Sequence, residues 1–337
     1  MLCKALYNFL FLSGKPISAF RWGLLLAAPC AMFALFVGRF TPNLLGEAAQ
    51  PQLGPQDFGL RAVAVELPIG KGEHLRGVFV NAGRGAPVVL HLLGGGETLT
   101  ARTKVAGEMV WVGDVVRDLV ALGLSSLVLD YRGVGRSSGK RDSRQIPADA
   151  YVAWEEAVRR AGGHTRRVAL RATSLGTLAA ASLIEGGAMP GAIMLVAPLR
   201  AQTVAVHWLR ARRSSLAAFL GWLFLRRPLA ADQEQAISEM RAPLLIVFGI
   251  RDELLPSAER QRLLAAARAV GATVVERDQE HLPLMRDAHR LMPGERALYA
   301  SLRWLSSGQI LSSRHACACR SGDAEQSVTG WIVKGQR

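Results

Sequence analysis

Three residue types that together perform nucleophilic catalysis occur at Ser174, Asp252 and His281. A serine hydroxyl is a weak nucleophile until a neighbouring base takes its proton. His281 can act as that base because histidine titrates near neutral pH, and Asp252 can orient the imidazole and stabilise its charged form. The three residues therefore predict acyl transfer through a covalent intermediate on Ser174.

The segment around Ser174 has the pattern of a strand that turns sharply into a helix. It is Ala172-Thr173-Ser174-Leu175-Gly176, between an apolar run and an Ala- and Leu-rich run at 177–185. Such a turn needs small residues two positions before and after the serine, because the helix packs close to the strand. Gly176 meets this need, and Ala172 adds only a methyl group where glycine is usual. A helix N-cap is the alternative role for Ser174, but the acid and base elsewhere in the chain favour the nucleophile.

The acid and the base each follow a predicted strand. Asp252 comes shortly after the apolar run 243–249, and His281 follows the apolar run 272–275 and a short polar loop. In open α/β sheets, ligands bind beyond the carboxyl ends of the strands. We therefore expect Asp252 and His281 at the same edge of the sheet as Ser174.

Predicted strands and helices alternate through the middle of the chain. This alternation predicts a mainly parallel sheet covered by helices on both faces. The expected strands are 60–67, 77–81, 88–93, 126–130, 168–172, 192–197, 243–249 and 273–275, and the expected helices are 110–122, 149–160, 175–185, 257–270 and 295–305.

These motifs resemble the α/β-hydrolase superfamily, in particular serine hydrolases of the esterase, monoglyceride-lipase and aminopeptidase type. The resemblance spans about residues 60–305, and the chain order Ser, Asp, His is the one that this fold uses. It implies an α/β-hydrolase fold with a helical cap over the site. The matching segments are His91-Leu92-Leu93-Gly94-Gly95-Gly96, Asp130-Tyr131-Arg132-Gly133-Val134-Gly135-Arg136-Ser137-Ser138-Gly139, the Ser174 turn, residues 249–256 and His281.

An acyl-transfer site also needs two backbone N–H donors for the developing oxyanion. The resemblance places one at Leu175, directly after the nucleophile, and the other in the loop after the third strand. The family usually has His-Gly at that strand end, whereas Leu93 precedes Gly94 here. The second donor is therefore either Gly94 or Gly95.

Three polar residues near these motifs are expected to have structural roles. His91 lies inside a predicted buried strand, so we expect a core histidine with satisfied hydrogen bonds. Asp130 and Arg132 lie in the segment that resembles the loop after the fourth strand of α/β-hydrolases. We expect them to hold the loop by an ion pair.

The amino-terminal segment differs in kind from the rest. Residues 22–37 form an almost uninterrupted apolar run bounded by Arg21 and Arg39, somewhat shorter than the about 20 residues that usually span a bilayer. Three interpretations remain: a membrane anchor, which we favour, a cleaved signal peptide, or an apolar helix packed on the domain. Basic residues ahead of the run favour a cytoplasmic amino terminus. The predicted location is a bacterial inner membrane with the hydrolase domain periplasmic, and the alternatives are secretion after cleavage or the cytoplasm.

The chain divides into three expected parts. These are an anchor or signal segment with a linker at 1–50, an α/β-hydrolase domain at 51–307 and a disordered tail at 308–337. Within the domain, residues 199–241 interrupt the alternation and predict a helical cap. This insertion mixes aromatic and arginine side chains, so it is either an ordinary cap with solvated arginines or a lid that contacts anionic lipid.

The composition narrows the choice of partners. A net charge of +14 suits an anionic partner. Nucleic acid is discounted, because the arginines are spread along the chain and no nucleic-acid motif occurs, whereas anionic membrane lipid suits the predicted anchor. We expect no cofactor and no metal, since the cysteine pattern indicates neither a disulfide framework nor a zinc site. The 4 cysteines are Cys3, Cys30, Cys317 and Cys319.

The favoured function is hydrolysis of a small-molecule carboxylic ester or thioester by a Ser-His-Asp triad. One alternative is a non-catalytic hydrolase-fold protein that binds a ligand or partner at the membrane. Another is a serine aminopeptidase, but such enzymes need acidic groups to hold the substrate amine, and no such cluster is recognisable in the sequence. Related dehalogenases and epoxide hydrolases carry Asp at the position of Ser174, so the resemblance disfavours them.

Overall fold

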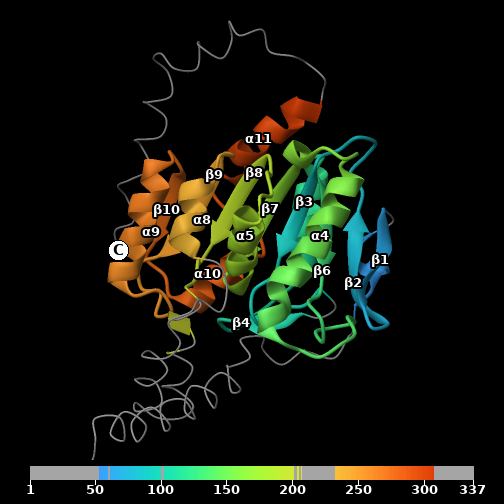
Figure 1. Cartoon of the computed structure of the whole chain (residues 1–337), viewed down its shortest axis with the longest axis horizontal. Helices are drawn as coiled ribbons and strands as arrows, with labels where there is room; N and C mark the ends of the chain where they lie inside the picture. Colours follow the sequence, from blue (N-terminus) through green and yellow to red (C-terminus); the bar gives the residue numbers. More distant parts are fainter. Residues whose placement is uncertain are drawn as a thin grey trace, which may run out of the picture.

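The core of the protein is a mixed β-sheet, seen in a computed structural model that describes residues 53–306 except 60, 100–101, 201–202, 205 and 207–231. The sheet is 8-stranded, with the order β1-β2-β6-β3-β7-β8-β9-β10 (Figure 1). β2 pairs antiparallel with both β1 and β6, and the other pairs in this sheet are parallel. The strands are β1 (Ala62–Gly70), β2 (Glu73–Val80), β3 (Val88–Leu92), β6 (Ser125–Leu129), β7 (Val168–Thr173), β8 (Ala192–Val196), β9 (Leu244–Gly249) and β10 (Thr273–Arg277).

The inner strands are apolar along most of their length because helices cover both faces of the sheet. β8 has the sequence AIMLV and β9 has LLIVFG, and every residue of both strands is buried. β1, at the edge of the sheet, has mostly exposed and half-buried residues instead. The core therefore runs along the central strands, and β7, which leads into Ser174, lies among them.

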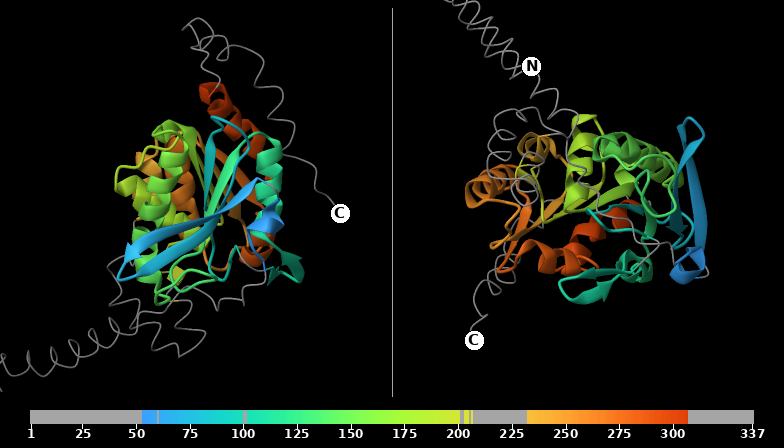
Figure 2. Two further views of the ribbon diagram at one scale, coloured as in Figure 1. Left: turned by 90° about the vertical axis from the view of Figure 1, so that its right-hand side faces the viewer. Right: turned by 90° about the horizontal axis from the view of Figure 1, so that it is seen from below.

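The helices form one layer on each face of the sheet (Figure 2). α4, α5, α8 and α9 lie on one face, and α3 and α11 lie on the other. α3 is amphipathic and buries Val112, Val115, Val116 and Leu119, which share one side of the helix. The helices are α3 (Val112–Ala121), α4 (Ile146–Arg160), α5 (Leu175–Glu185), α8 (Gln233–Glu239), α9 (Ser257–Ala269), α10 (His281–Asp287) and α11 (Glu295–Ser306), with 3-10 turns η1 (Pro55–Phe58), η2 (Ser143–Gln145) and η3 (Thr165–Arg167).

The predicted mainly parallel sheet with helices on both faces is confirmed. The structure adds two elements beside the site, a β-hairpin and the helix α10. A hairpin of β4 (Thr103–Val105) and β5 (Glu108–Val110) turns at Ala106 and Gly107, whose φ angles are 47° and 87°. This hairpin contacts α10, where Arg286 pairs with Glu108 at 3.1 Å. Both elements were missed because segments this short give no periodic hydrophobic pattern.

Several predicted segments fall outside the described residues. These are the apolar run 22–37, most of the predicted cap, the tail 308–337 and all 4 cysteines. In the described part of the chain, no helix is long and apolar enough to cross a bilayer.

The carboxyl end of the range predicted as a cap is described and differs from the expectation. Asp232 caps α8 by accepting the Glu234 N–H, and Ala236 and Ile237 of this helix are fully buried. α8 packs against α5 and α9. Because it buries apolar side chains in the core, α8 belongs to the helical layer and not to a cap.

Candidate active site

Ser174 lies at the turn from β7 into α5 in a strained conformation. Its φ of 50° and ψ of −115° lie outside the regions that non-glycine residues normally adopt. Neighbouring hydrogen bonds hold this strain: the Ser174 N–H donates to Val196 O at 2.8 Å, and the Thr177 N–H donates to Ser174 O at 2.9 Å. The chain therefore makes the sharp strand-to-helix turn that the sequence predicts.

Gly176 permits the close approach of α5 to the end of β3. A Cβ atom at Gly176 would lie 2.0 Å from Leu92 O, a backbone atom that cannot move away easily. Ala172, on the other side of the serine, is fully buried in β7 and tolerates its methyl group there. The prediction that the turn requires a small residue at position 176 is confirmed.

The structure brings Ser174, His281 and Asp252 together in one hydrogen-bonded line. Ser174 Oγ lies 2.8 Å from His281 Nε2, and His281 Nδ1 lies 2.8 Å from Asp252 Oδ2. All three residues are buried. Each nitrogen of the imidazole therefore has a defined partner, which is the arrangement that lets a histidine accept a serine proton while a carboxylate stabilises the resulting charge.

Asp252 and His281 are positioned by loops after β9 and β10. Asp252 Oδ1 accepts the Leu254 N–H at 2.8 Å, which fixes the carboxylate plane. His281 is the first residue of α10, and its N–H donates to Glu253 Oε2 at 3.2 Å. The residue next to the acid thus holds the backbone of the base. Both loops leave the carboxyl ends of neighbouring parallel strands, as the sequence predicts.

The loop after β3 distinguishes between the two glycines predicted as oxyanion donors. The Gly94 N–H already donates to Glu97 Oε2 at 2.6 Å, so it is occupied. Gly95, the next residue, is exposed. Leu175 begins α5, and the first N–H groups of a helix have no intrahelical acceptor. The geometry therefore disfavours Gly94 and is compatible with Gly95 and Leu175.

A buried polar cluster that the sequence did not reveal lies behind the site. Arg171 of β7 forms an ion pair with Glu295 of α11, with 2.7 Å between Nε and Oε1. Burial alone would lower the pKa of Arg171, but Glu295 more than offsets this, so the pKa is raised. His91 is a core histidine, as expected: burial, followed by the charge of Arg171, holds the pKa of His91 well below its usual value. The sequence feature that could have revealed this cluster is the arginine inside the apolar run 168–172.

The loop after β6 is held differently from the prediction. Arg132 pairs with Asp149 of α4, with 2.6 Å between Nη2 and Oδ1, and not with Asp130. Asp130 instead accepts hydrogen bonds from Thr98 Oγ1 at 2.9 Å and from the Leu99 N–H at 2.8 Å. Burial raises the pKa of Asp130 to about 7 despite these hydrogen bonds. The predicted ion pair was wrong because Asp130 faces the loop after β3, and Arg132 reaches a carboxylate supplied by a helix.

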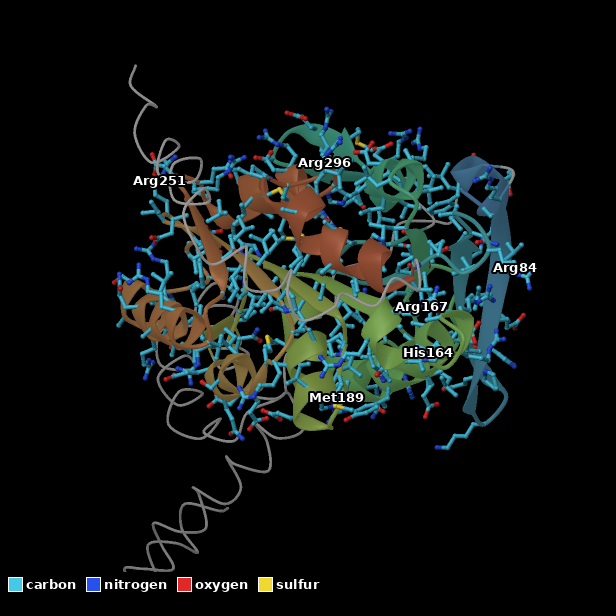
Figure 3. The ribbon with its side chains drawn as sticks, turned by 90° about the horizontal axis from the view of Figure 1, so that it is seen from above. Arg84, His164, Arg167, Met189, Arg251 and Arg296 are labelled. Atoms are coloured by element: carbon cyan, nitrogen blue, oxygen red, sulfur yellow. The ribbon has the colours of Figure 1, made fainter. Side chains whose placement is uncertain are left out.

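Metal ligands and surface charge add little to this site. Within the described ranges, no group of three or more His, Cys, Asp or Glu side chains is placed to hold a metal ion. Exposed arginines are spread around the molecule: Arg84 and Arg251 lie at opposite ends of the sheet and Arg296 lies on another side (Figure 3). These three charges therefore do not share a face.

Comparisons with known proteins bear on the class of protein. A family model described as serine aminopeptidase, S33, matches residues 105–239. An uncharacterized protein of Mycobacterium tuberculosis is 29% identical over 222 residues, which cover 65% of this chain and 73% of that protein.

Solved structures show the same fold at low sequence identity. An esterase of Pyrococcus furiosus has a TM-score of 0.57 and 15% identity, over 79% of this chain and 98% of that one. An alpha-beta hydrolase of Vibrio vulnificus has a TM-score of 0.52 and 16% identity, over 74% of this chain and 81% of that one. With the sheet order and the strained serine turn, these likenesses show that the chain has the α/β-hydrolase fold.

Proposed function

We propose that the protein is a serine hydrolase that cleaves small carboxylic esters or thioesters through an acyl-enzyme on Ser174. The observation that carries this proposal is the hydrogen-bonded line from Ser174 Oγ through His281 to Asp252, with both contacts at 2.8 Å. The strained φ of Ser174 adds support, because such strain gathers at functional sites. A non-catalytic binding protein would need neither the hydrogen-bonded line nor the strained serine.

The geometry supports the following steps. Ser174 Oγ attacks the substrate carbonyl carbon while His281 Nε2 takes the hydroxyl proton, and Asp252 stabilises the imidazolium. The N–H groups of Gly95 and Leu175 stabilise the oxyanion. His281 then returns the proton to the leaving alcohol or thiol, which leaves the acyl group on Ser174. Water, deprotonated by the same histidine, releases the carboxylic acid and restores the free serine.

A serine aminopeptidase is the second candidate, favoured by the description of the matching family model. Such an enzyme needs a free acidic group to bind the substrate amine. Glu253, the acidic residue beside Asp252, already accepts the His281 N–H at 3.2 Å, so it is poorly placed to do so. We therefore favour ester and thioester substrates over peptides.

A substrate panel separates the two candidates. Purified protein would be assayed with p-nitrophenyl esters of short and medium acyl chains, thioesters, and aminoacyl p-nitroanilides, with Ser174→Ala as the control. We expect Ser174-dependent turnover of the esters or thioesters. Turnover restricted to the aminoacyl anilides would replace the esterase with the peptidase, and a lack of Ser174-dependent turnover on every substrate would favour the binding protein.

We also propose that the domain is attached to a membrane by the apolar run 22–37, with membrane lipid as a partner. The basic residues ahead of this run support a cytoplasmic amino terminus and a periplasmic domain. A reporter enzyme fused after Ser306 should be active outside the cytoplasm and sediment with membranes. Reporter activity confined to the cytoplasm would refute the topology, and a soluble periplasmic product would indicate a cleaved signal peptide.

A further inference from the structure

Glu97 connects two parts of the site that come from distant parts of the chain. It is buried, and its two carboxylate oxygens have different partners. Oε2 accepts the Gly94 N–H at 2.6 Å, inside the loop after β3. Oε1 lies 3.2 Å from Nε2 of His289, which follows the helix α10 that begins at the proposed base, His281.

His289 is itself fixed from two sides. Its Nδ1 lies 3.0 Å from Met285 O in α10. Arg171 Nη2 donates to the carbonyls on either side of His289, to Ala288 O at 2.7 Å and to Arg290 O at 3.2 Å. Because Arg171 belongs to β7, the strand that leads into Ser174, the nucleophile strand sets the position of His289.

The two ring nitrogens of His289 have different partners. A carbonyl only accepts hydrogen bonds, so His289 Nδ1 must donate to Met285 O. Nε2 then faces Glu97 Oε1 at 3.2 Å. The other carboxylate oxygen, Oε2, stays available to the Gly94 N–H.

Packing leaves little freedom at this point of the loop. A Cβ atom at Gly94 would lie 2.6 Å from Met285 Cε and 3.1 Å from Glu97 Oε2. The cavity beside Glu97, lined by His91, Arg171 and His289 among others, has a volume of about 10 Å³. This volume suits no more than about one water molecule, so the cluster does not bind substrate.

We propose that Glu97 is a positioning residue for the oxyanion hole. Because Glu97 accepts the hydrogen bond from the Gly94 N–H, it sets the orientation of the following peptide. The Gly95 N–H then faces the substrate carbonyl. His289 fixes the position of Glu97 relative to α10, the helix that begins at His281. Arg171 in turn fixes the position of His289. This inference rests on the proposed hydrolase function for its catalytic consequence.

The charges around Glu97 are consistent with this role. A bare carboxylate close to a developing oxyanion would oppose it by like-charge repulsion. Arg171 interacts electrostatically with Glu97, and His289 contacts its Oε1. The positive charge of Arg171 thus offsets part of the negative field of Glu97, while the carboxylate oxygens hold the loop.

Variants of Glu97 test the inference with a split between kcat and KM. Glu97→Leu removes both contacts, and Glu97→Gln keeps them, because its carbonyl can accept from Gly94 and its amide can donate to His289 Nε2. With an ester substrate and active-site titration, we expect Glu97→Leu to lower kcat about 10- to 100-fold, below the effect of deleting a donor outright, with KM within about twofold. Glu97→Gln should restore kcat to within about threefold of wild type.

A matched control removes a buried carboxylate elsewhere. Glu156 of α4 is as buried as Glu97 and binds Arg159 and Arg160. Glu156→Leu should leave kcat per titrated site unchanged, since α4 carries no proposed site residue. If Glu97→Leu keeps the wild-type kcat, or if Glu97→Gln loses as much as Glu97→Leu, the inference is wrong.

Two further measurements keep the test decisive. If Glu97→Leu does not fold, Glu97→Asp retains the charge but is one methylene shorter, and kcat should still fall at least about tenfold. Hydrogen exchange of the peptide that contains residues 94–99 should accelerate in Glu97→Leu and Glu97→Asp, and not in Glu97→Gln or Glu156→Leu. Exchange reads the loop without catalysis, so it supports or overturns the positioning role of Glu97 even if wild type shows no Ser174-dependent turnover and the proposed function fails.

Discussion

His281 Nδ1 lies 2.8 Å from Asp252 Oδ2, although the two residues belong to loops after different strands. Both side chains are almost completely inaccessible to solvent. A charge-assisted hydrogen bond of this length in a buried setting fixes the histidine tautomer, so that Nε2 can accept a proton from Ser174. In the proposed mechanism, His281 therefore depends on Asp252 to act as the base.

Replacing Asp252 by Asn should therefore leave the fold intact and remove most of the activity. The amide can present its N–H to the ring and select the wrong tautomer, and comparable changes in serine proteases lower kcat by about 10⁴. Steady-state kinetics on an ester would measure the effect. Asp278→Asn, at a carboxylate whose side chain is 76% exposed, is the control and should change kcat by less than about twofold. A near-normal kcat for Asp252→Asn would contradict the role of the acid.

Gly176→Ala should disturb both stability and activity. The added Cβ would meet Leu92 O at 2.0 Å, and since that atom is backbone, α5 must shift away from β3. Overpacking of this kind costs about 1–3 kcal/mol, and the shift moves Leu175 together with Ser174. Urea denaturation and kcat would report the two effects. Ser182→Ala, on the half-buried side of the same helix, should have little effect on either. Wild-type values for Gly176→Ala would show that the close packing is not required.

Arg171→Met should be strongly destabilising because it leaves Glu295 buried without its partner. Removing one member of a buried pair typically costs about 3–5 kcal/mol. The double variant Arg171→Met/Glu295→Met should recover part of this loss, since no buried charge then remains uncompensated. Arg159→Met, whose side chain is 68% exposed, should cost less than about 1 kcal/mol. Equal losses for Arg171→Met and Arg159→Met in chemical denaturation would argue against a structural role for the buried pair.

Asp130 predicts a specific dependence of stability on pH. Burial raises the pKa of Asp130 to about 7, whereas an unfolded aspartate titrates near about 3.9. Between these values the folded protein binds the extra proton. The stabilising contribution is therefore fully present below about pH 4 and is lost as the pH rises through about 7.

Asp130→Asn removes this titration but keeps a carbonyl that can accept from Thr98 and Leu99. The stability of the variant relative to wild type should rise with pH in this window, with a slope of at most about 1.4 kcal/mol per pH unit. Thermal or urea denaturation of both proteins at several pH values would measure it. Parallel pH profiles for the two proteins would mean that Asp130 does not titrate in this range.

Local patterns were sufficient to predict the central sheet and the serine turn. Long apolar strands and amphipathic helices have clear periodicity, and Gly176 is explained by the turn alone. Pairings chosen in three dimensions were not predictable in this way. Arg132 was expected to pair with Asp130 nearby in the sequence, but the fold brings Asp149 of α4 to it.

The cluster behind the site was missed for the same reason. Glu97, Arg171 and His289 lie far apart in the sequence, and each alone resembles an ordinary polar residue. They meet because the parallel strands place the ends of β3 and β7 side by side, with the segment after α10 packed behind them. The preference for Gly95 over Gly94 likewise depends on a contact that no local pattern encodes.

The most direct test of the central claim is covalent labelling of Ser174. Wild-type protein treated with a fluorophosphonate should gain one adduct by intact-protein mass spectrometry, and peptide mapping should locate it on Ser174. The reason is that His281 lies 2.8 Å from Ser174 Oγ and can activate it. Ser174→Ala should gain no adduct, and its ester turnover should fall by about 10⁴ to 10⁶. Labelling at another residue, or unchanged turnover in Ser174→Ala, would contradict the proposed nucleophile.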